Sequence, residues 1–418
     1  NECLMTYQDK TNVKKVGYTI FVILACLTLS HIPVWGLSSD TLSQLFKVPI
    51  LSFTDVLAGG ALSKLAIGGF GVTSLIMAGI VIQLLALIAP KIETLHGQGE
   101  MGRRFFDRLT LILAMLFTLG FSIATVWSSV AAYGFGVYIA VPMIEWMIGS
   151  FIIVKLAQSV HDFGIGNGST LILAANIAQR IPAEIIARSY QPSENVWIVC
   201  VMLLCVILVS VYYQYARIDI EVQQTRKAVS VMNAEGRVSI PMAMSSVLPL
   251  IYASGFIAIP SLVGMFVHDE SGRLGVIINA FQGANMYNPA TPEQWAGLGF
   301  FIFLVVFFSL YASRMSFSSG EVVNRMMIRG DVIKGVPVSE MVPYLEKRRK
   351  KLAWISSIFM VIIAVVPDMV ALKCGVTTFS FMGTSLIILM AAFMDVKIRL
   401  TGMMQSYNKK YKLFKDGE

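Results

Sequence analysis

Long apolar stretches separated by short polar ones run through the whole chain, and they predict ten membrane-spanning helices. Each stretch holds about twenty residues, which as a helix rising about 1.5 Å per residue crosses the ~30 Å hydrocarbon core of a bilayer. The predicted spans are residues 16–35, 72–89, 109–128, 135–157, 169–187, 196–215, 247–267, 296–312, 352–372 and 379–398. The pattern therefore predicts an all-α membrane protein with ten transmembrane helices.

One apolar stretch, residues 57–67, is too short to cross a membrane. As a helix it would be about 16 Å long, and such a segment is tolerated only where it is buried in protein or lines a cavity. Gly68, Gly69 and Gly71 separate it from the span that starts at Val72. We expect a re-entrant half-helix hinged by these glycines onto that span. An ordinary helical hairpin with a re-entrant loop, as in many transporters, fits the spacing equally well.

Positive charges lie mostly on one side of the predicted spans. With the N-terminus placed in the cytoplasm, 27 of the 33 lysines and arginines fall on the cytoplasmic side and 6 on the other. Loops rich in Lys and Arg stay in the cytoplasm, so both termini are predicted to be cytoplasmic and the number of spans to be even. The chain has a net charge of +8 and is 56% hydrophobic, and its basic residues lie between apolar spans. This arrangement favours a membrane protein over a nucleic-acid-binding one.

The predicted spans divide into five and five, which indicates two structural halves. An odd number of spans in each half inverts the second half relative to the first, as in inverted-repeat channels and transporters. We place the N-terminal half at residues 1–190 and the C-terminal half at residues 191–418. The C-terminal half carries two long cytoplasmic loops, 217–246 and 314–351, which are polar enough to extend into the cytosol and too short to form domains.

A run of five basic residues ends the second of these loops: Lys347, Arg348, Arg349, Lys350 and Lys351. Such a run stops transfer of the chain and anchors it to anionic lipids. It also offers a docking surface for an acidic or RNA-bearing partner. The two roles are compatible, and the sequence leaves both open.

Few polar side chains interrupt the spans. Glu145 lies near the middle of the fourth span, where an ionisable group is a candidate for a proton or ion relay. A structural hydrogen bond and a water-facing wall are the alternatives for this residue. Asn176 and Gln179 in the fifth span are expected to bond to neighbouring helices. No cluster of carboxylates resembles a coupling-ion site, which disfavours a pump.

No residue pattern indicates an enzyme or a metal site. The four histidines fall in different parts of the chain and the five cysteines form no CxxC pair, so we expect no catalytic residues, no metal and no cofactor. The GIGNG segment, Gly164 to Gly168, lacks the preceding strand and the lysine of a nucleotide-binding loop. Its glycines instead predict a tight cytoplasmic turn into the fifth span.

Six segments resemble one known family, SecY, the protein-conducting channel, and they occur in that family's order. They are AGGALSKLAIGGFGV, IVIQLL, GQGEMGRR, GIGNGSTLI, VLPLIYASGF and GTSLIILMAAFMD. The resemblance implies ten helices in two inverted halves that form a clamshell, with residues 57–67 as its plug. The plug residues that it assigns are Leu57, Gly59, Gly60, Leu62 and Leu65.

The resemblance also implies an apolar ring that constricts a pore. Its members are Val72 and Ile76 on the second span, Leu173 on the fifth, Ile251 and Phe256 on the seventh and Ile388 on the tenth. Branched apolar side chains hold little water, so such a ring resists ions, and their non-directional contacts seal around varied sequences. Phe256 is bulkier than the aliphatic residue usual in the family, and it shares a helical face with Ile251 only if the span bends.

The function implied by the resemblance is a protein translocation channel in the cell membrane, with a lateral gate that carries Gln83. The implied partners are SecE-like and SecG-like small membrane subunits, a SecA-type ATPase motor or the ribosome, signal sequences and membrane lipids. The motor or ribosome would engage the cytoplasmic loops, including Arg226 and Lys227. The alternative is an inverted-repeat secondary transporter for a small solute, which needs convergent polar groups at mid-membrane.

Two cytoplasmic loops depart from the family pattern. The segment 241–249 is short and lacks the usual basic residue, and GVPVSE at 335–340 lacks the arginine typical of housekeeping members. Because the motor and the ribosome engage these loops, the departures favour a divergent member, the channel of an accessory Sec system, over a housekeeping channel.

Overall fold

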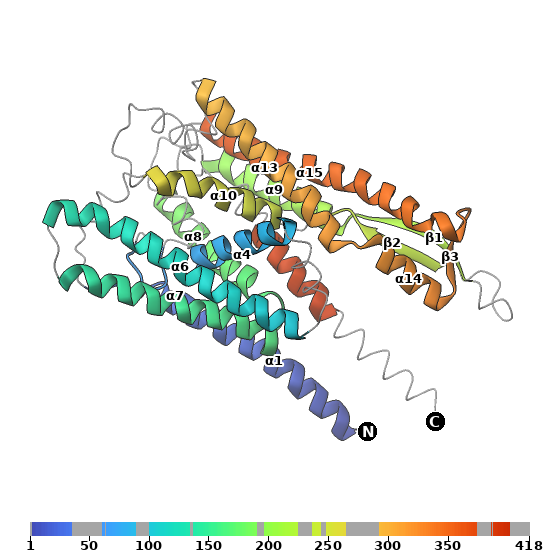
Figure 1. Cartoon of the computed structure of the whole chain (residues 1–418), viewed down its shortest axis with the longest axis horizontal. Coiled ribbons are helices and arrows are strands. Elements are labelled where there is room, and N and C mark those ends of the chain that lie inside the picture. The colour runs from blue at the N-terminus through green and yellow to red at the C-terminus, as the bar shows by residue number, and fades with distance from the viewer. Residues whose placement is uncertain are drawn as a thin grey trace. The chain divides into compact units, whose positions relative to one another are not determined.

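The computed structural model describes residues 2–35, 61–62, 64–88, 100–133, 137–189, 196–224, 236–243, 248–264, 292–373, 386 and 388–401, and Figure 1 draws them as ribbons. Its helices are α1 (Glu2–Leu29), α4 (Gly71–Ile88), α6 (Glu100–Tyr133), α7 (Val137–Phe163), α8 (Gly168–Ser189), α9 (Val196–Tyr215), α10 (Leu248–Gly264), α13 (Pro292–Ser316), α14 (Ser319–Arg329), α15 (Met341–Lys373) and an unlabelled last helix at 388–401. The strands are β1 (Arg217–Gln224), β2 (Gly236–Pro241) and β3 (Asp331–Ile333), and a 3₁₀ turn η2 covers Val338–Glu340.

Each predicted span overlaps one of these helices where the structure describes it, and the bounds of α9 coincide with the predicted 196–215. Within the described residues, four helices are long and apolar enough to cross a membrane: Arg104–Val126, Ala140–Phe163, Trp295–Ile328 and Val338–Pro367. Three shorter apolar helices are Gly71–Ile82, Leu204–Tyr215 and Leu248–Ile257. The helical class follows from the structure, and the number of ten spans stays a prediction.

The tight turn predicted at GIGNG is present. Helix α7 ends at Phe163 and α8 begins at Gly168, and between them Gly166 has a φ of +97°, which favours glycine. The Asn167 side chain accepts a hydrogen bond from the backbone N–H of Ser169 at 3.2 Å, which satisfies a donor in the first turn of α8. The predicted turn is confirmed, and its cytoplasmic side stays a prediction.

The predicted half-helix at 57–67 is wrong for the residues that the structure describes there. Residues 61, 62 and 64–70, here named the re-entrant arm, form turns. Their backbone groups bond to the end of α1: Ile67 N–H donates to the Ile32 carbonyl at 2.9 Å, and Gly68 N–H to the Leu29 carbonyl at 3.1 Å. Backbone groups paired with another segment are not free for a helical ladder. Leu57, Gly59 and Gly60 lie outside the described residues.

The chain divides into two compact units. Unit 1 contains Asn1–Val196, Gly255–Trp295 and Ile388–Glu418, and unit 2 contains Trp197–Ser254 and Ala296–Ile387. Within unit 1, α4 packs against α6, α7 and α8, and α1 packs against α7 and α8. The predicted division into halves 1–190 and 191–418 stays a prediction.

In unit 2, segments from the two long loops fold together, which the sequence analysis did not anticipate. Strands β1, β2 and β3 form an antiparallel sheet in the order β2-β1-β3, and Figure 1 shows them beside α14 and the start of α15. We name this assembly the sheet module. Its buried core consists of Val222, Ile240, Val323, Met326, Ile333, Met341, Leu345 and Leu352. Each loop alone is too short for a domain, but together they bury a core.

The ends of α14 explain why this helix forms inside a polar loop. The side chain of Ser318 accepts a hydrogen bond from the Glu321 N–H, and Gly330, with a φ of 75°, donates its N–H to the carbonyls of Met326 and Met327. These contacts satisfy backbone groups that a helix leaves unpaired at its two termini. The alternation of Ile218, Ile220 and Val222 in β1 is the strand signal that the sequence analysis missed.

Candidate functional site

Five of the six predicted ring residues are buried. Val72, Ile76, Leu173, Ile251 and Ile388 are between 1% and 8% exposed, and Phe256 is half-buried. Five of the six belong to unit 1, while Ile251 belongs to unit 2. Side chains this deeply buried do not face lipid, as residues on the outside of a helical bundle would.

α4 and α10 approach each other closely beside one predicted ring residue, Ile76. A Cβ on Gly255 would clash with the end of Ile80 and would lie 3.6 Å from Ile76 Cγ2. Glycine at this position therefore lets α10 pack directly on the α4 face that carries Ile76 and Ile80.

The re-entrant arm packs against α6 and α7 through aromatic side chains. The ring of Phe70 stacks on Phe121 of α6 with 5.6 Å between centroids, and it meets Trp146 of α7 edge-on at 5.0 Å. The indole N–H of Trp146 donates to the Ala66 carbonyl at 3.2 Å, while Leu62 and Leu65 of the predicted plug are buried. The arm thus contributes apolar side chains to the interior of unit 1.

Glycines allow the backbone of the arm to touch α7. A Cβ on Gly149 would clash with the carbonyl oxygen of Ile67, and a Cβ on Gly68 of the arm would lie 3.0 Å from Ile153 Cδ1. A contact this tight leaves no room for a side chain, so the fit between the arm and α7 depends on glycine at these positions.

A polar cluster lies where α1 ends. His31 Nδ1 lies 2.8 Å from the Leu27 carbonyl oxygen, and His31 Nε2 lies 3.0 Å from Lys64 Nζ of the arm and 3.3 Å from Gln179 Nε2 of α8. The contact of Gln179 with another element agrees with its predicted role. Histidine had no role in the sequence analysis, because its partners are distant along the chain.

Glu145 accepts a hydrogen bond from the Trp35 backbone N–H at 2.9 Å. Of the three interpretations left open by the sequence, this contact supports the structural hydrogen bond. Asn176 is 1% exposed, and in the part of the chain that the structure describes neither of its amide atoms has a hydrogen-bond partner. The prediction that Asn176 bonds to a neighbouring helix is therefore not met among those residues. The side chain of Gln83, the predicted gate residue, is not among the side chains that the structure describes.

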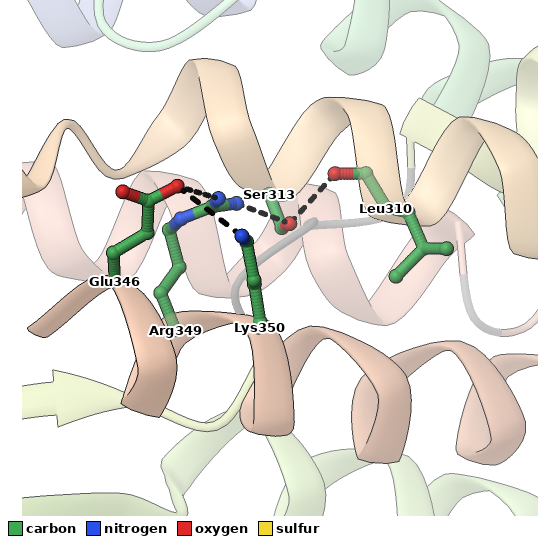
Figure 2. A network of polar contacts seen from close by, with 5 residues as sticks. All are labelled: Leu310, Ser313, Glu346, Arg349 and Lys350. Atoms are coloured by element: carbon green, nitrogen blue, oxygen red, sulfur yellow. Dashed lines mark hydrogen bonds and ion pairs between the residues drawn. The ribbon is translucent and has the colours of Figure 1, made fainter. Parts of the chain in front are cut away.

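The predicted basic docking residues separate into two groups. Lys347, Arg348, Lys350 and Lys351 are exposed, whereas Arg349 is 7% exposed. Figure 2 shows Arg349 donating to Ser313 Oγ of α13 at 3.3 Å and pairing with Glu346 at 3.7 Å. Arg349 therefore joins α15 to α13, a contact that a run of like charges does not reveal. Arg226 and Lys227 lie outside the described residues.

Similarity to known proteins decides the family. A sequence model of SecY matches residues 66–397, which is most of the chain. The chain belongs to the SecY family. Among curated SecY-family relatives, the protein translocase subunit SecY of Thermotoga maritima is 28% identical, with 90% of each chain covered. The protein of the same name from Pseudomonas aeruginosa is 26% identical, covering 93% of this chain and 90% of its own.

Solved structures of SecY and Sec61 share the fold. A SecY structure described for its plug domain, which stabilises the closed state of the translocation channel, gives a TM-score of 0.66 at 17% identity, covering 94% of this chain and 93% of its own. The Sec61 of a canine ribosome-channel complex gives a TM-score of 0.60 at 15% identity, with 94% and 92% covered. These comparisons confirm the predicted family and the class of all-α, multi-pass membrane proteins.

Proposed function

We propose that this SecY-family chain is the central subunit of a protein translocation channel. It passes unfolded secretory polypeptides across the membrane through the ring of Val72, Ile76, Leu173, Ile251, Phe256 and Ile388, and it releases transmembrane segments through a lateral gate that includes Gln83. The observation that carries the proposal is the burial of five apolar ring residues at positions that match the family motifs. The relatives named protein translocase subunit SecY support it.

An apolar ring suits this task for two reasons. Water is poorly held between branched apolar side chains, so a closed ring of them resists ions. Apolar contact is also non-directional, so the same ring closes around chains of any sequence. A ring built on hydrogen bonds or charges would bind some segments and stall them. The chain needs no catalytic residue for this role, since a motor or the ribosome supplies the work.

Polar substitution of the ring tests the proposal. The channel, purified with its co-purifying subunits and reconstituted in planar bilayers, should show higher ion conductance with Ile76→Asn, because the amide retains water in the constriction. Ile76→Val, which keeps a branched apolar side chain, is the matched control and should stay closed. Translocation of an unfolded secretory precursor into vesicles is the second measurement. Vesicles that take up small solutes and no precursor would instead support the secondary transporter.

The segment 57–67 is proposed to act as the plug of this channel. Two of its assigned residues, Leu62 and Leu65, are buried in unit 1, where the re-entrant arm packs on α7. Replacing residues 57–67 with a short Gly/Ser linker should therefore raise the ion conductance of the reconstituted channel. Equal conductance of the two proteins would remove the plug assignment and leave the ring untouched.

The partners are proposed to be SecE-like and SecG-like membrane subunits, signal sequences, lipids, and a SecA-type motor or the ribosome. The motor or ribosome would bind on the cytoplasmic face, where both termini are also proposed to lie. A ribosome complex is known for the similar canine Sec61. Docking is assigned to the exposed Lys347, Arg348, Lys350 and Lys351, together with Arg226 and Lys227. Reversing the four exposed charges should weaken motor or ribosome recovery in a low-salt pulldown, and unchanged recovery would refute docking there. The departures at 241–249 and 335–340 support an accessory channel.

A further inference from the structure

The contacts of His31 determine which ring nitrogen carries the proton. Nδ1 lies 2.8 Å from the carbonyl oxygen of Leu27, which only accepts hydrogen bonds, so Nδ1 must be the donor. In a neutral imidazole, Nε2 is then the acceptor. Its neighbours fit that role, because the ammonium of Lys64 and the amide nitrogen of Gln179 are both donors.

One nitrogen thus links three segments that are distant in sequence. Lys64 belongs to the re-entrant arm, Gln179 to α8, and His31 follows the end of α1. Other contacts between the arm and α1 are made by backbone groups, as in the bond from Val34 N–H to the Leu65 carbonyl at 2.7 Å. The His31 contact differs from these because its hydrogen-bonding character changes when the ring is protonated.

We propose that His31 is a positioning residue that holds the re-entrant arm against α1 and α8, and that its protonation releases the arm. The inference rests on the proposed function of the arm as part of the seal. Protonation turns Nε2 from an acceptor into a donor and places an imidazolium against the ammonium of Lys64. A ring that carries both protons cannot accept from Lys64, so the arm should be held less firmly in acid and held again as the pH rises.

Other charged groups near this end of α1 do not reproduce the effect. Among the described side chains, the charged group that comes from the arm is Lys64 itself. Glu145 comes from α7 and accepts from Trp35 N–H. Its variant Glu145→Gln keeps an acceptor oxygen and removes the carboxylate. α8 contributes the uncharged Gln179.

Amide hydrogen exchange of the peptide covering residues 64–71 tests the release directly. It is measured in the reconstituted complex from about pH 8 to about pH 5.5, the range in which an imidazole changes charge. Wild-type protein is compared with His31→Gln at each pH, which removes the intrinsic pH dependence of exchange. The glutamine oxygen accepts from Lys64 at every pH. Wild-type exchange should exceed that of the variant by about two- to tenfold at the acidic end, as expected for the loss of one hydrogen bond, and match it at the alkaline end.

Three further variants make the result decisive. His161→Gln, at the other end of α7 and exposed, should keep the wild-type profile, and so should Glu145→Gln. His31→Arg should exchange fast at all pH values, because its charge is permanent. Equal profiles for wild type and His31→Gln would overturn the proposal, as would loss of the acid step in Glu145→Gln.

Ion conductance over the same pH range separates this inference from the proposed function. Conductance that rises with acid in wild type and not in His31→Gln supports both. Exchange that rises with acid while conductance stays flat supports the positioning role of His31 and contradicts the role of the arm in the seal.

Discussion

The re-entrant arm and the sheet module are stabilised in opposite ways. The arm has little structure of its own: its backbone bonds to the end of α1, its carbonyl at Ala66 is bonded by Trp146, and glycines on and beside it allow close packing on α7. The sheet module buries its own core, and its helix α14 is capped at both ends. The arm depends on its neighbours for stability, whereas the module depends on itself.

This difference suits the two proposed roles. A segment that opens with the channel must be held by contacts that can be broken one at a time, and regions that move are drawn from the less stable parts of a protein. A docking surface must instead keep its shape when a partner binds or leaves. Substitutions in the arm should therefore change the seal, and substitutions in the buried core of the module should change its local stability and leave the seal intact.

The largest effect is expected from a cavity in the module. Ile240 of β2 is 1% exposed within the core, and Ile240→Ala should destabilise the module by about 2–5 kcal/mol, the usual cost of truncating a buried aliphatic side chain. Hydrogen exchange of β1 and α14 measures the loss. Ile240→Val, which removes a single methylene, is the graded control. Ion conductance should stay at the wild-type level, and a leak would show that the module also supports the seal.

A smaller effect on stability, but a direct one on the seal, is expected at Gly149. Gly149→Ala places a methyl group against the Ile67 carbonyl, and overpacking of this kind costs about 1–3 kcal/mol. The arm should shift away from α7 and the reconstituted channel should leak ions. Gly120→Ala on α6, where a Cβ would meet nothing within 4 Å, is the matched control. A tight channel with Gly149→Ala would mean that the arm is not part of the seal.

The same contrast explains what the sequence could predict. Helix α9 and the turn at Gly166 follow from local signals, a continuous apolar run and the three glycines of GIGNG, and both were predicted correctly. The arm was predicted as a half-helix because it lies in a short apolar stretch that ends at a glycine break, while its actual conformation depends on partners at and just after the end of α1. A contact between distant segments leaves no periodic signal.

The module and Arg349 were missed for related reasons. The alternation in β1 indicates a strand, but a strand is stable only with partners, and β3 comes from a different loop. Arg349 looks like its neighbours in a basic run, yet its place on α15 turns it toward Ser313. The ring residues remain predictions by family resemblance, with burial as the structural support for five of them.

The smallest expected effects compare the arm and the module most directly. Two substitutions of similar cost in stability, one in each region, should differ in their effect on ion conductance. Trp146→Phe keeps a ring beside Phe70 and removes the N–H that bonds the Ala66 carbonyl, a loss of about 0.5–1.5 kcal/mol. Ser318→Ala removes the cap of α14 at a cost of about 0.5–2 kcal/mol. Both should speed hydrogen exchange locally, in residues 64–71 for the first variant and in α14 for the second. Only Trp146→Phe should also raise ion conductance, because the arm has no buried core of its own that would keep it in place once this hydrogen bond is lost. Equal conductance in the two variants would mean that the arm is as self-sufficient as the module, and the contrast between the two regions would fail.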